Sequence, residues 1–326
     1  MKNAVILLHM LYLFSLQSNE CLSISIKKDT VAVDGSKINW FEFEWLANPD
    51  YFNLNVEKAH MLVDVRFEGL PAPFPLYFRL MATENTIYNK TKDAMIWHYP
   101  AFEQKIVRRQ SAGRSVIEHF PGIEIKLGDS RLNYGLAAFK VVTDPRATGQ
   151  NAHAINVGGT ISPVLFSKKV LFIDFPNRRI GYSDAIPEGY LNRGIYTKLQ
   201  FVMGYITIPI KIRNKKYWFW LSGDSTPVLE VYNEKLFNRI KSNIHTKDSL
   251  LVFSDFNKIE IVSGTYTYED VYFETFKLNR QNVYFVDREK TRFDGKRISG
   301  TISYAFFFDY TIVIDYKNQR FGLVPK

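Results

Sequence analysis

The sequence predicts a mostly β protein built from two related halves. Three observations support this fold class: the aromatic-rich composition, segments in which apolar and polar residues alternate, and an internal repeat. The 326 residues are 46% hydrophobic and 15% aromatic, with 26 Phe, 19 Tyr and 5 Trp. Aromatic and β-branched side chains suit the pleated, half-buried surface of a sheet. The composition also excludes disordered, collagen-like and coiled-coil classes.

The first segment in chain order, residues 1–18, is predicted to be a secretory signal peptide. Lys2 gives a positive start, Ala4 to Leu16 is an apolar run, and Ser18 is small enough to precede a cleavage site. The run is too short to span a bilayer, and no later stretch is long and apolar enough to be a transmembrane segment. We therefore expect a secreted, periplasmic or cell-envelope protein. A buried N-terminal helix is the alternative interpretation.

Cys21 is the only cysteine, so the sequence excludes a disulfide framework and a cysteine-rich metal site. Glu20 stands directly before it, where a bacterial lipoprotein signal has a small residue, and a lipid anchor is therefore not expected. Whether Cys21 is modified is left open.

An internal repeat organises the rest of the chain. Residues 159–181 read GTISPVLFSKKVLFIDFPNRRIG and residues 300–322 read GTISYAFFFDYTIVIDYKNQRFG, and ten of the 23 aligned positions are identical. Each copy predicts an apolar strand, a turn containing Asn, and a short return strand. The repeat predicts an N-terminal half at 25–185 and a C-terminal half at 195–326, with a linker around 183–192.

Each half also contains a predicted hairpin upstream of its repeat. In the second half, residues 208–213 alternate, Asn214-Lys215 makes a turn, and residues 217–221 return as a strand that runs into Ser222. In the first half, residues 62–67 alternate in the same way. A proline-rich connection follows, and residues 76–81 form the next predicted strand.

Two halves that begin with a hairpin and end with Gly-x-Ile, strand, Asn turn and strand resemble the pepsin-like aspartic proteases, most closely their secreted bacterial branch. The resemblance covers most of the mature chain and is strongest in the closing segments, whereas residues 92–150 match weakly. It implies two pseudo-symmetric β lobes with a cleft between them. It also implies one catalytic Asp from each lobe, because two neighbouring carboxylates that share a proton supply the acid and the base.

The sequence departs from that family at the decisive positions. The resemblance aligns Arg79 and Leu221 with the two catalytic Asp residues, and Ser162 and Ser303 replace the second Gly of Gly-x-Ile-Gly. Arginine stays protonated and does not act as a base. We therefore predict that no catalytic residues are present and that the chain is a pseudoenzyme.

Asp224 lies three residues after Leu221 and is the nearest carboxylate in the second half. We predict that it pairs with Arg79, which would otherwise be buried without a partner; the alternative is an Arg79 that points into water. The predicted binding residues are Arg79, Ser222, Asp224 and Ser225. An active endopeptidase with an atypical site involving Asp224 remains the alternative function.

Other chemistries lack support in the sequence. The six histidines show no metal-ligand spacing, and there is no nucleophile elbow or phosphate-binding glycine loop, so no metal and no cofactor are expected. The net charge of +9 is scattered over the chain, and no nucleic-acid-binding module is present. The expected partner is an extended peptide or protein segment in the cleft between the lobes, or an envelope component bound through an interaction module. A purely structural protein that uses its outer surface is a third interpretation.

Overall fold

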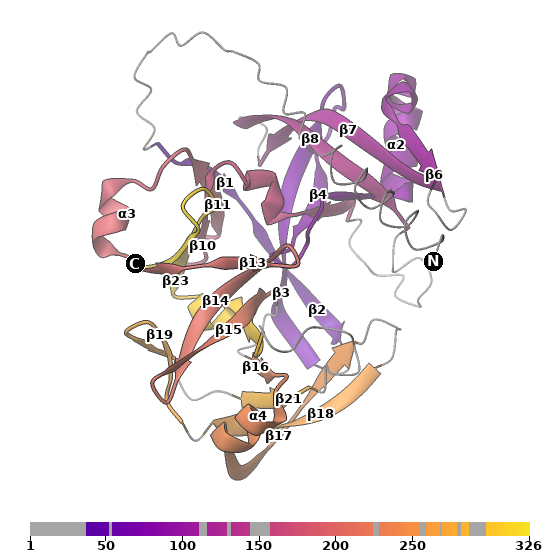
Figure 1. The fold of residues 1–326 in the computed structure, drawn as a ribbon. Coiled ribbons are helices and arrows are strands. Elements are labelled where there is room, and N and C mark those ends of the chain that lie inside the picture. The colour runs from indigo at the N-terminus through magenta and orange to yellow at the C-terminus, as the bar shows by residue number, and fades with distance from the viewer. Residues whose placement is uncertain are drawn as a thin grey trace, which may run out of the picture. The chain divides into compact units, whose positions relative to one another are not determined.

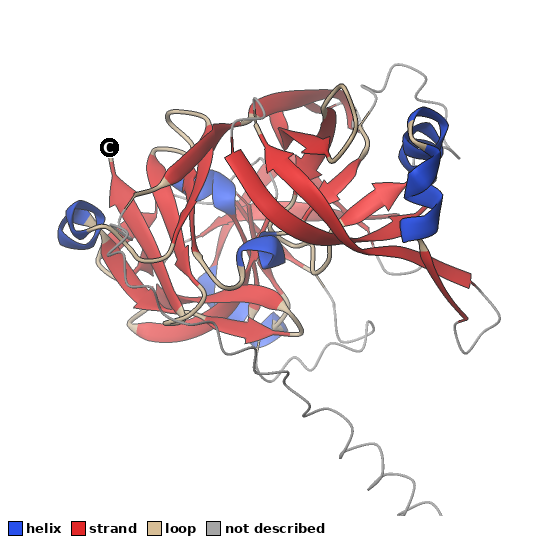
Figure 2. Cartoon of the chain, turned by 90° about the horizontal axis from the view of Figure 1, so that it is seen from above, coloured by secondary structure: helices blue, strands red, loops and turns tan. Residues whose placement is uncertain are grey.

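The computed structural model describes residues 37–51, 54–110, 116–128, 132–143, 157–223, 228–253, 259–267, 269–278, 282–286 and 298–326. The predicted signal peptide and Cys21 lie outside these residues. In the described part of the chain, strands account for far more of the structure than helices (Figure 2). The mostly β fold class is thereby confirmed.

The described strands form three sheets. The first sheet, which takes strands from both halves of the chain, has the order β1 (Asn39–Glu42), β11 (Arg179–Ser183), β10 (Val170–Asp174), β23 (Tyr310–Asp315), β24 (Arg320–Pro325) and β12 (Ile195–Lys198). The second belongs to the first half, in the order β2 (Glu44–Tyr51), β3 (Leu54–Phe67), β4 (Phe74–Phe78), β9 (Gly159–Ile161), β5 (Thr86–Tyr88), β8 (Leu132–Val142), β7 (Val116–Leu127) and β6 (Val107–Gln110).

The third sheet belongs to the second half. Its order is β17 (Lys241–Phe253), β18 (Ile259–Thr267), β21 (Asn282–Phe285), β16 (Val228–Val231), β22 (Gly300–Ser303), β15 (Lys215–Ser222), β14 (Tyr205–Ile212), β19 (Val271–Phe273) and β20 (Phe276–Leu278), with β13 (Gln200–Val202) paired to β14. Figure 1 shows β14 and β15 as the predicted hairpin.

The described helical segments are short. They are α2 (Asn89–His98), η1 (Pro100–Lys105), η2 (Pro163–Phe166), α3 (Glu188–Arg193), α4 (Glu234–Ile240) and η4 (Tyr304–Phe307). None of the helices in the described ranges has the length and apolar character that crossing a membrane requires.

The second and third sheets repeat one pattern of strand pairing, which establishes the pseudo-symmetry. In the first half, β9 pairs in parallel with β4 and antiparallel with β5. In the second half, β22 pairs in parallel with β15 and antiparallel with β16. A helix follows directly after β5 and another follows shortly after β16, namely α2 and α4. The two halves are therefore two copies of one β unit.

The two copies meet in the first sheet along β10 and β23. These strands are antiparallel, and Phe172 pairs with Val313. The two residues occupy the same position in the repeat, because 313 − 172 = 141 is also the offset between residues 159 and 300. A pseudo-two-fold axis therefore passes between Phe172 and Val313, both of which are fully buried.

Each repeat closes with the same buried carboxylate. Asp315 accepts hydrogen bonds from the Asn318 backbone N–H at 2.9 Å and from its Nδ2 at 2.8 Å, and the Arg320 guanidinium lies at 2.9 Å. Asp174 receives the equivalent contacts from Asn177 and Arg179. The identical Asp, Asn and Arg of the two copies thus fix the turn between the last two strands of each half.

The structure departs from the sequence-based element limits in two places. Strand β4 ends at Phe78, three residues before the predicted end at Met81, and the predicted linker at 183–192 contains five of the six residues of α3. The poorly matched residues 92–150 contribute most of α2 together with η1, β6, β7 and β8. The domain limits 25–185 and 195–326 stay predictions.

Candidate functional site

The predicted site lies at the carboxyl ends of β4 and β15, where the two halves carry equivalent strand ends. Arg79 follows β4 directly, and its backbone N–H donates to the Ile161 carbonyl at 3.1 Å. Its side chain is exposed, and the guanidinium carbon lies 4.7 Å from the centre of the Tyr77 ring. A cation over an aromatic face is attracted by the electron-rich ring. Arg79 is thus stabilised by an aromatic neighbour while its guanidinium faces solvent.

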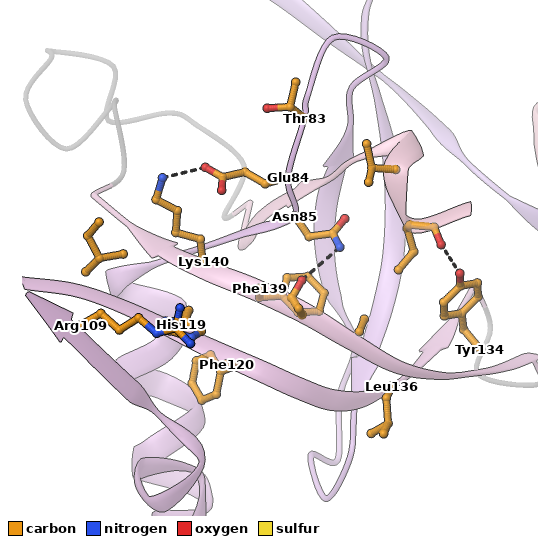
Figure 3. Close-up of a pocket in the computed structure, with 15 residues that line it drawn as sticks. Thr83, Glu84, Asn85, Arg109, His119, Phe120, Tyr134, Leu136, Phe139 and Lys140 are labelled. Atoms are coloured by element: carbon orange, nitrogen blue, oxygen red, sulfur yellow. Dashed lines mark hydrogen bonds and ion pairs between the residues drawn. The ribbon is translucent and has the colours of Figure 1, made fainter. Parts of the chain in front are cut away.

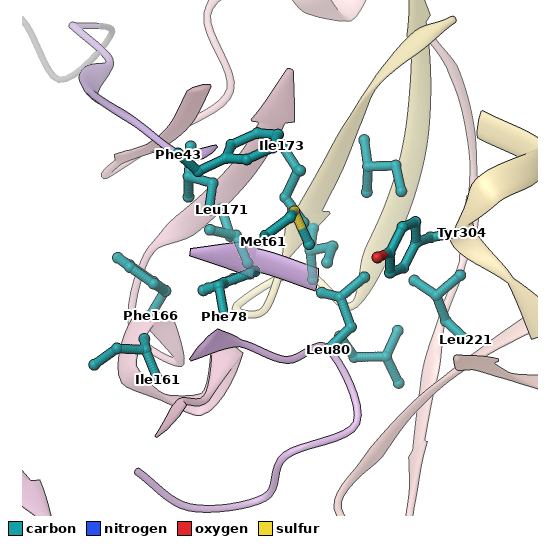
Figure 4. Close-up of a cluster of buried hydrophobic side chains, with 14 of the residues drawn as sticks. Phe43, Met61, Phe78, Leu80, Ile161, Phe166, Leu171, Ile173, Leu221 and Tyr304 are labelled. Carbon is teal, nitrogen blue, oxygen red and sulfur yellow. The ribbon is translucent and has the colours of Figure 1, made fainter. Parts of the chain in front are cut away.

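Leu221 has a different environment from Arg79. Its side chain is 0% exposed and belongs to the main hydrophobic cluster, together with Leu80 and Tyr304 (Figure 4). Leu80 comes from the strand end of the first half, and Leu221 and Tyr304 come from the second half. Apolar side chains of both halves therefore fill the volume just below the two strand ends.

The strand register shows which positions of the two halves correspond. Ile161 pairs with Phe78, and its repeat counterpart Ile302 pairs with Leu221. Leu221 therefore corresponds to Phe78, and Ser222 rather than Leu221 is the counterpart of Arg79. The resemblance-based alignment of Arg79 with Leu221 is offset by one residue in this register.

The loops after these strand ends differ in length between the halves. Gly159 pairs with Ile87, and its repeat counterpart Gly300 pairs with Val231. From Phe78 to Ile87 the chain advances 87 − 78 = 9 residues, whereas from Leu221 to Val231 it advances 231 − 221 = 10. The second half thus carries one extra residue in this loop.

Two of the predicted binding residues fall in that longer loop. Asp224 and Ser225 lie outside the described residues, so the predicted ion pair between Arg79 and Asp224 stays a prediction. Ser222 is buried at the end of β15 and pairs with Ser303 across the parallel strands.

The two serines that replace glycine in the closing segments have a local structural role. The Ser162 Oγ accepts a hydrogen bond from the Val164 N–H at 3.1 Å, and the Ser303 Oγ accepts one from the Ala305 N–H at 3.0 Å. Each side chain therefore caps the short 3-10 turn that follows it, η2 or η4. The serines satisfy backbone donors that a glycine would leave to other partners.

Asn85 links the first-half loop to its surroundings. Its Oδ1 accepts from the Ser162 N–H at 2.9 Å, and its Nδ2 donates to the Ala138 carbonyl at 3.1 Å. The neighbouring Glu84 forms an ion pair with Lys140 at 2.8 Å. Glu84, the first carboxylate after Arg79 in the sequence, is thus directed toward β8.

A groove of about 660 Å³ opens beside this loop, over β7 and β8 (Figure 3). Its charged and imidazole-bearing lining residues are Glu84, Arg109, His119 and Lys140. Its other lining residues are mainly apolar and include Ile117, Tyr134, Leu136, Val164 and Leu165. No sequence motif marks this groove, because its residues come from the loop before β5, from β6, β7 and β8, and from η2.

Tyr134 connects two walls of the groove. Its hydroxyl donates to the Leu165 carbonyl, which links β8 to η2. Burial, together with the nearby Tyr182, raises the pKa of Tyr134 to about 12. The phenol therefore stays protonated and remains a hydrogen-bond donor over the physiological pH range.

Across the described ranges, no group of three or more His, Cys, Asp or Glu side chains is placed to hold a metal ion. Taken together, the fold and the strand ends define a mostly β protein of two related halves with an apolar junction beneath the strand ends.

Similarity to known proteins is found among solved structures. No family model matches the chain, and no curated protein matches it. A solved structure to which it is similar is that of conglutin gamma, described as a unique basic 7S globulin from lupine seeds. The TM-score is 0.46 and the sequence identity 10%, over 89% of this chain and 95% of that chain. Nothing about this protein follows from a likeness at that level.

Proposed function

We propose that this chain is a non-catalytic protein with a pepsin-like arrangement of two lobes, and that it binds an extended peptide or protein segment at the paired strand ends. The proposal includes an extracytoplasmic location, which rests on the signal-peptide pattern of residues 1–18. The resemblance of the two closing segments to those of pepsin-like enzymes supports the pepsin-like assignment.

The observation that carries the proposal is the lack of an acidic residue at the first-half strand end. An aspartic protease needs two carboxylates close enough to share a proton. Residues 78–83 contain no Asp or Glu. The next carboxylate, Glu84, is paired with Lys140. The strand end of the first half, residues 78–83, therefore supplies no carboxylate that could share a proton with Asp224.

The same strand end offers a binding group in place of a catalytic one. Arg79 presents an exposed guanidinium, and the Tyr77 ring beneath it restricts where that guanidinium lies. Guanidinium groups bind carboxylates and carbonyl oxygens through several N–H donors. An extended segment has such acceptors along its whole length.

The proposal is tested with immobilised protein and a synthetic library of random, extended peptides. We expect the native chain to retain a subset of the library, and Arg79→Ala to reduce retention by about tenfold, the loss typical of a charged hydrogen bond. Arg239→Ala, which removes an exposed arginine from α4, is the matched control and should not change retention.

Two outcomes would overturn the proposal. One is that the native chain retains no peptide. The other is that Arg79→Ala and Arg239→Ala retain the same peptides equally well.

The alternative function is an endopeptidase with an atypical site involving Asp224. An endopeptidase cleaves its substrate, whereas a binding protein retains it intact, so a peptide-cleavage assay at acid pH separates the two functions.

A further inference from the structure

The groove over β7 and β8 is a second surface that the proposed function does not use. It lies on the outer face of the three strands β6, β7 and β8, which pair in that order. Phe120 and Phe139, which also contribute to the lining of the groove, pair with each other across β7 and β8 and are buried. The exposed side chains of the groove, such as Ile117 and Leu136, come from the alternate positions along β7 and β8.

One end of this outer face is cationic. Arg109 pairs with Ile117 across β6 and β7, and His119 pairs with Lys140 across β7 and β8, so these four side chains share one face. Figure 3 shows Arg109 and His119 close together at this end.

Of the two cationic side chains Arg109 and Lys140, only Lys140 forms an ion pair with an acidic residue of the groove. Lys140 is paired with Glu84 at 2.8 Å. Arg109 is exposed and has no acidic partner among the side chains that the structure describes. The neighbouring Arg108 lies on the opposite face and uses Glu118. The groove therefore carries one uncompensated positive charge, at Arg109.

The other end of the groove is apolar. Leu136 is 75% exposed, Val164 is 41% exposed and Ile117, nearer to Arg109, is 37% exposed. Large apolar side chains that gather on one exposed surface indicate a contact site for another molecule. Figure 3 shows Leu136 and Tyr134 well separated from Arg109 and His119 along the groove.

From this layout we infer that the groove binds an extended segment of a partner protein with apolar side chains at one end and a carboxylate side chain at the other. The carboxylate pairs with Arg109, and the apolar side chains cover Leu136 and Val164. Charge complementarity selects an acidic segment because Arg109 is the unpaired charge. The high exposure of the apolar lining favours a segment lying along an open surface, since small-molecule sites enclose most of their ligand.

The walls of the groove are held in place before any partner binds. Asn85 ties the loop to β8 through the Ala138 carbonyl, and Tyr134 ties β8 to η2 through the Leu165 carbonyl. A preformed surface loses less conformational freedom on binding. The inference concerns a different surface from Arg79 and stands independently of the proposed function.

The test uses fluorescence anisotropy with a labelled synthetic peptide that carries leucine and valine at one end and glutamate at the other. A second peptide has lysine in place of glutamate. We expect the native chain to bind the glutamate peptide and to bind the lysine peptide at least about tenfold more weakly. Added salt should weaken binding of the glutamate peptide, because exposed charges are screened.

Three variants test the two ends of the groove one at a time and control for a change in the net charge of the protein. Arg109→Glu should weaken binding of the glutamate peptide by about tenfold or more and improve binding of the lysine peptide. Leu136→Ser should weaken binding of the glutamate peptide several-fold. Because Leu136 is largely exposed, this variant should keep its fold. Arg239→Glu makes the same change of charge on α4 and should leave binding within about twofold.

Four outcomes would overturn the inference. The native chain does not bind the glutamate peptide, or it binds both peptides equally. Arg109→Glu behaves like Arg239→Glu. Finally, laurate, an amphipathic carboxylate without a peptide backbone, binds at least as tightly as the glutamate peptide, which would indicate a small-molecule site.

Discussion

Phe172 and Val313, which occupy the same position of the two repeats, pair with each other across β10 and β23. The repeat and the strand register agree on this pair, although one is a property of the sequence and the other of the backbone. The pseudo-two-fold axis between them relates every strand pairing of the first half to one of the second. Equivalent substitutions in the two halves should therefore have similar effects.

The first prediction concerns the two equivalent glycines at which backbones approach closely. A Cβ built on Gly159 would lie 2.1 Å from the Thr86 carbonyl oxygen, and one on Gly300 would lie 1.8 Å from the Glu230 carbonyl oxygen. Neither strand can move aside without breaking its pairing. Gly159→Ala and Gly300→Ala should each lower the free energy of unfolding by about 2–3 kcal/mol, measured by urea denaturation.

Gly189→Ala is the matched control for these glycine variants. Gly189 lies in α3, and nothing lies within 4 Å of the position of its Cβ. Alanine favours a helix over glycine, so this variant should be neutral or more stable by up to about 1 kcal/mol. Equal effects of all three substitutions would contradict the close approach of the backbones.

The second prediction concerns the buried carboxylate that closes the second half. Asp315 is 0% exposed, and the pKa of its carboxyl is lowered: burial acts to raise it, but hydrogen bonds from Asn318 and Arg320 outweigh burial. Asp315→Asn keeps the shape but loses the charge-assisted bonds. We expect a loss of about 2–3 kcal/mol in the free energy of unfolding.

An exposed ion pair supplies the control for Asp315. Glu103 and Arg108 are 3.7 Å apart, and both side chains are more than half exposed. Glu103→Gln should change the free energy of unfolding by less than about 0.5 kcal/mol. If Asp315→Asn were as mild as Glu103→Gln, the repeated carboxylate would have no part in stabilising the fold.

The third prediction concerns the pH dependence of stability. Burial acts to raise the pKa of Glu274, but hydrogen bonds from Thr197, Lys211 and Lys216 outweigh it and hold this pKa at about 2, below its ordinary value of 4.5. A carboxyl with a lower pKa in the folded state stabilises the fold fully above pH 4.5 and loses that contribution as the pH falls toward 2.

Glu274→Gln tests this contribution through urea denaturation at several acid pH values. The variant should be less stable than the native chain at neutral pH and should lose less stability on acidification. Part of the acid sensitivity should persist, because Asp315 also has a lowered pKa. Parallel stability curves for the native chain and the variant would contradict the predicted role of Glu274.

Much of the fold could be predicted because the conserved positions of the repeat are residues that act on their near neighbours in the chain. In each closing segment a buried Asp, Asp174 or Asp315, binds the Asn and Arg that follow it and so fixes the turn. The apolar run before each Asp forms the inner strand, β10 or β23. The alternation of residues 208–213, the Asn214-Lys215 turn and the apolar run at 217–221 together predicted the hairpin of β14 and β15.

The candidate site could be predicted only in part. The apolar runs align Arg79 with Leu221, whereas in the structure Phe78 and Leu221 pair with the equivalent residues Ile161 and Ile302. A one-residue difference between the following loops is invisible to a pattern of apolar residues. The sequence left open whether Arg79 pairs with Asp224 or points into water, and the structure shows its side chain exposed above the Tyr77 ring.

The groove was not predicted at all. Arg109, His119 and Lys140 lie on three different strands, and only the pairing of β6, β7 and β8 brings them to one face. A single sequence carries no signal for that pairing. A site made of side chains from neighbouring strands can be recognised only once the strand pairing and its register are known.

A peptide-cleavage assay at acid pH is the sharpest test of the proposal that the strand ends hold no working pair of carboxylates. The native chain and Asp224→Asn are each incubated with a random peptide library, and the products are identified by mass spectrometry. We expect intact peptides with both proteins, because residues 78–83 at the strand end of the first half contain no Asp or Glu. Cleavage by the native chain that disappears in Asp224→Asn would contradict the proposal.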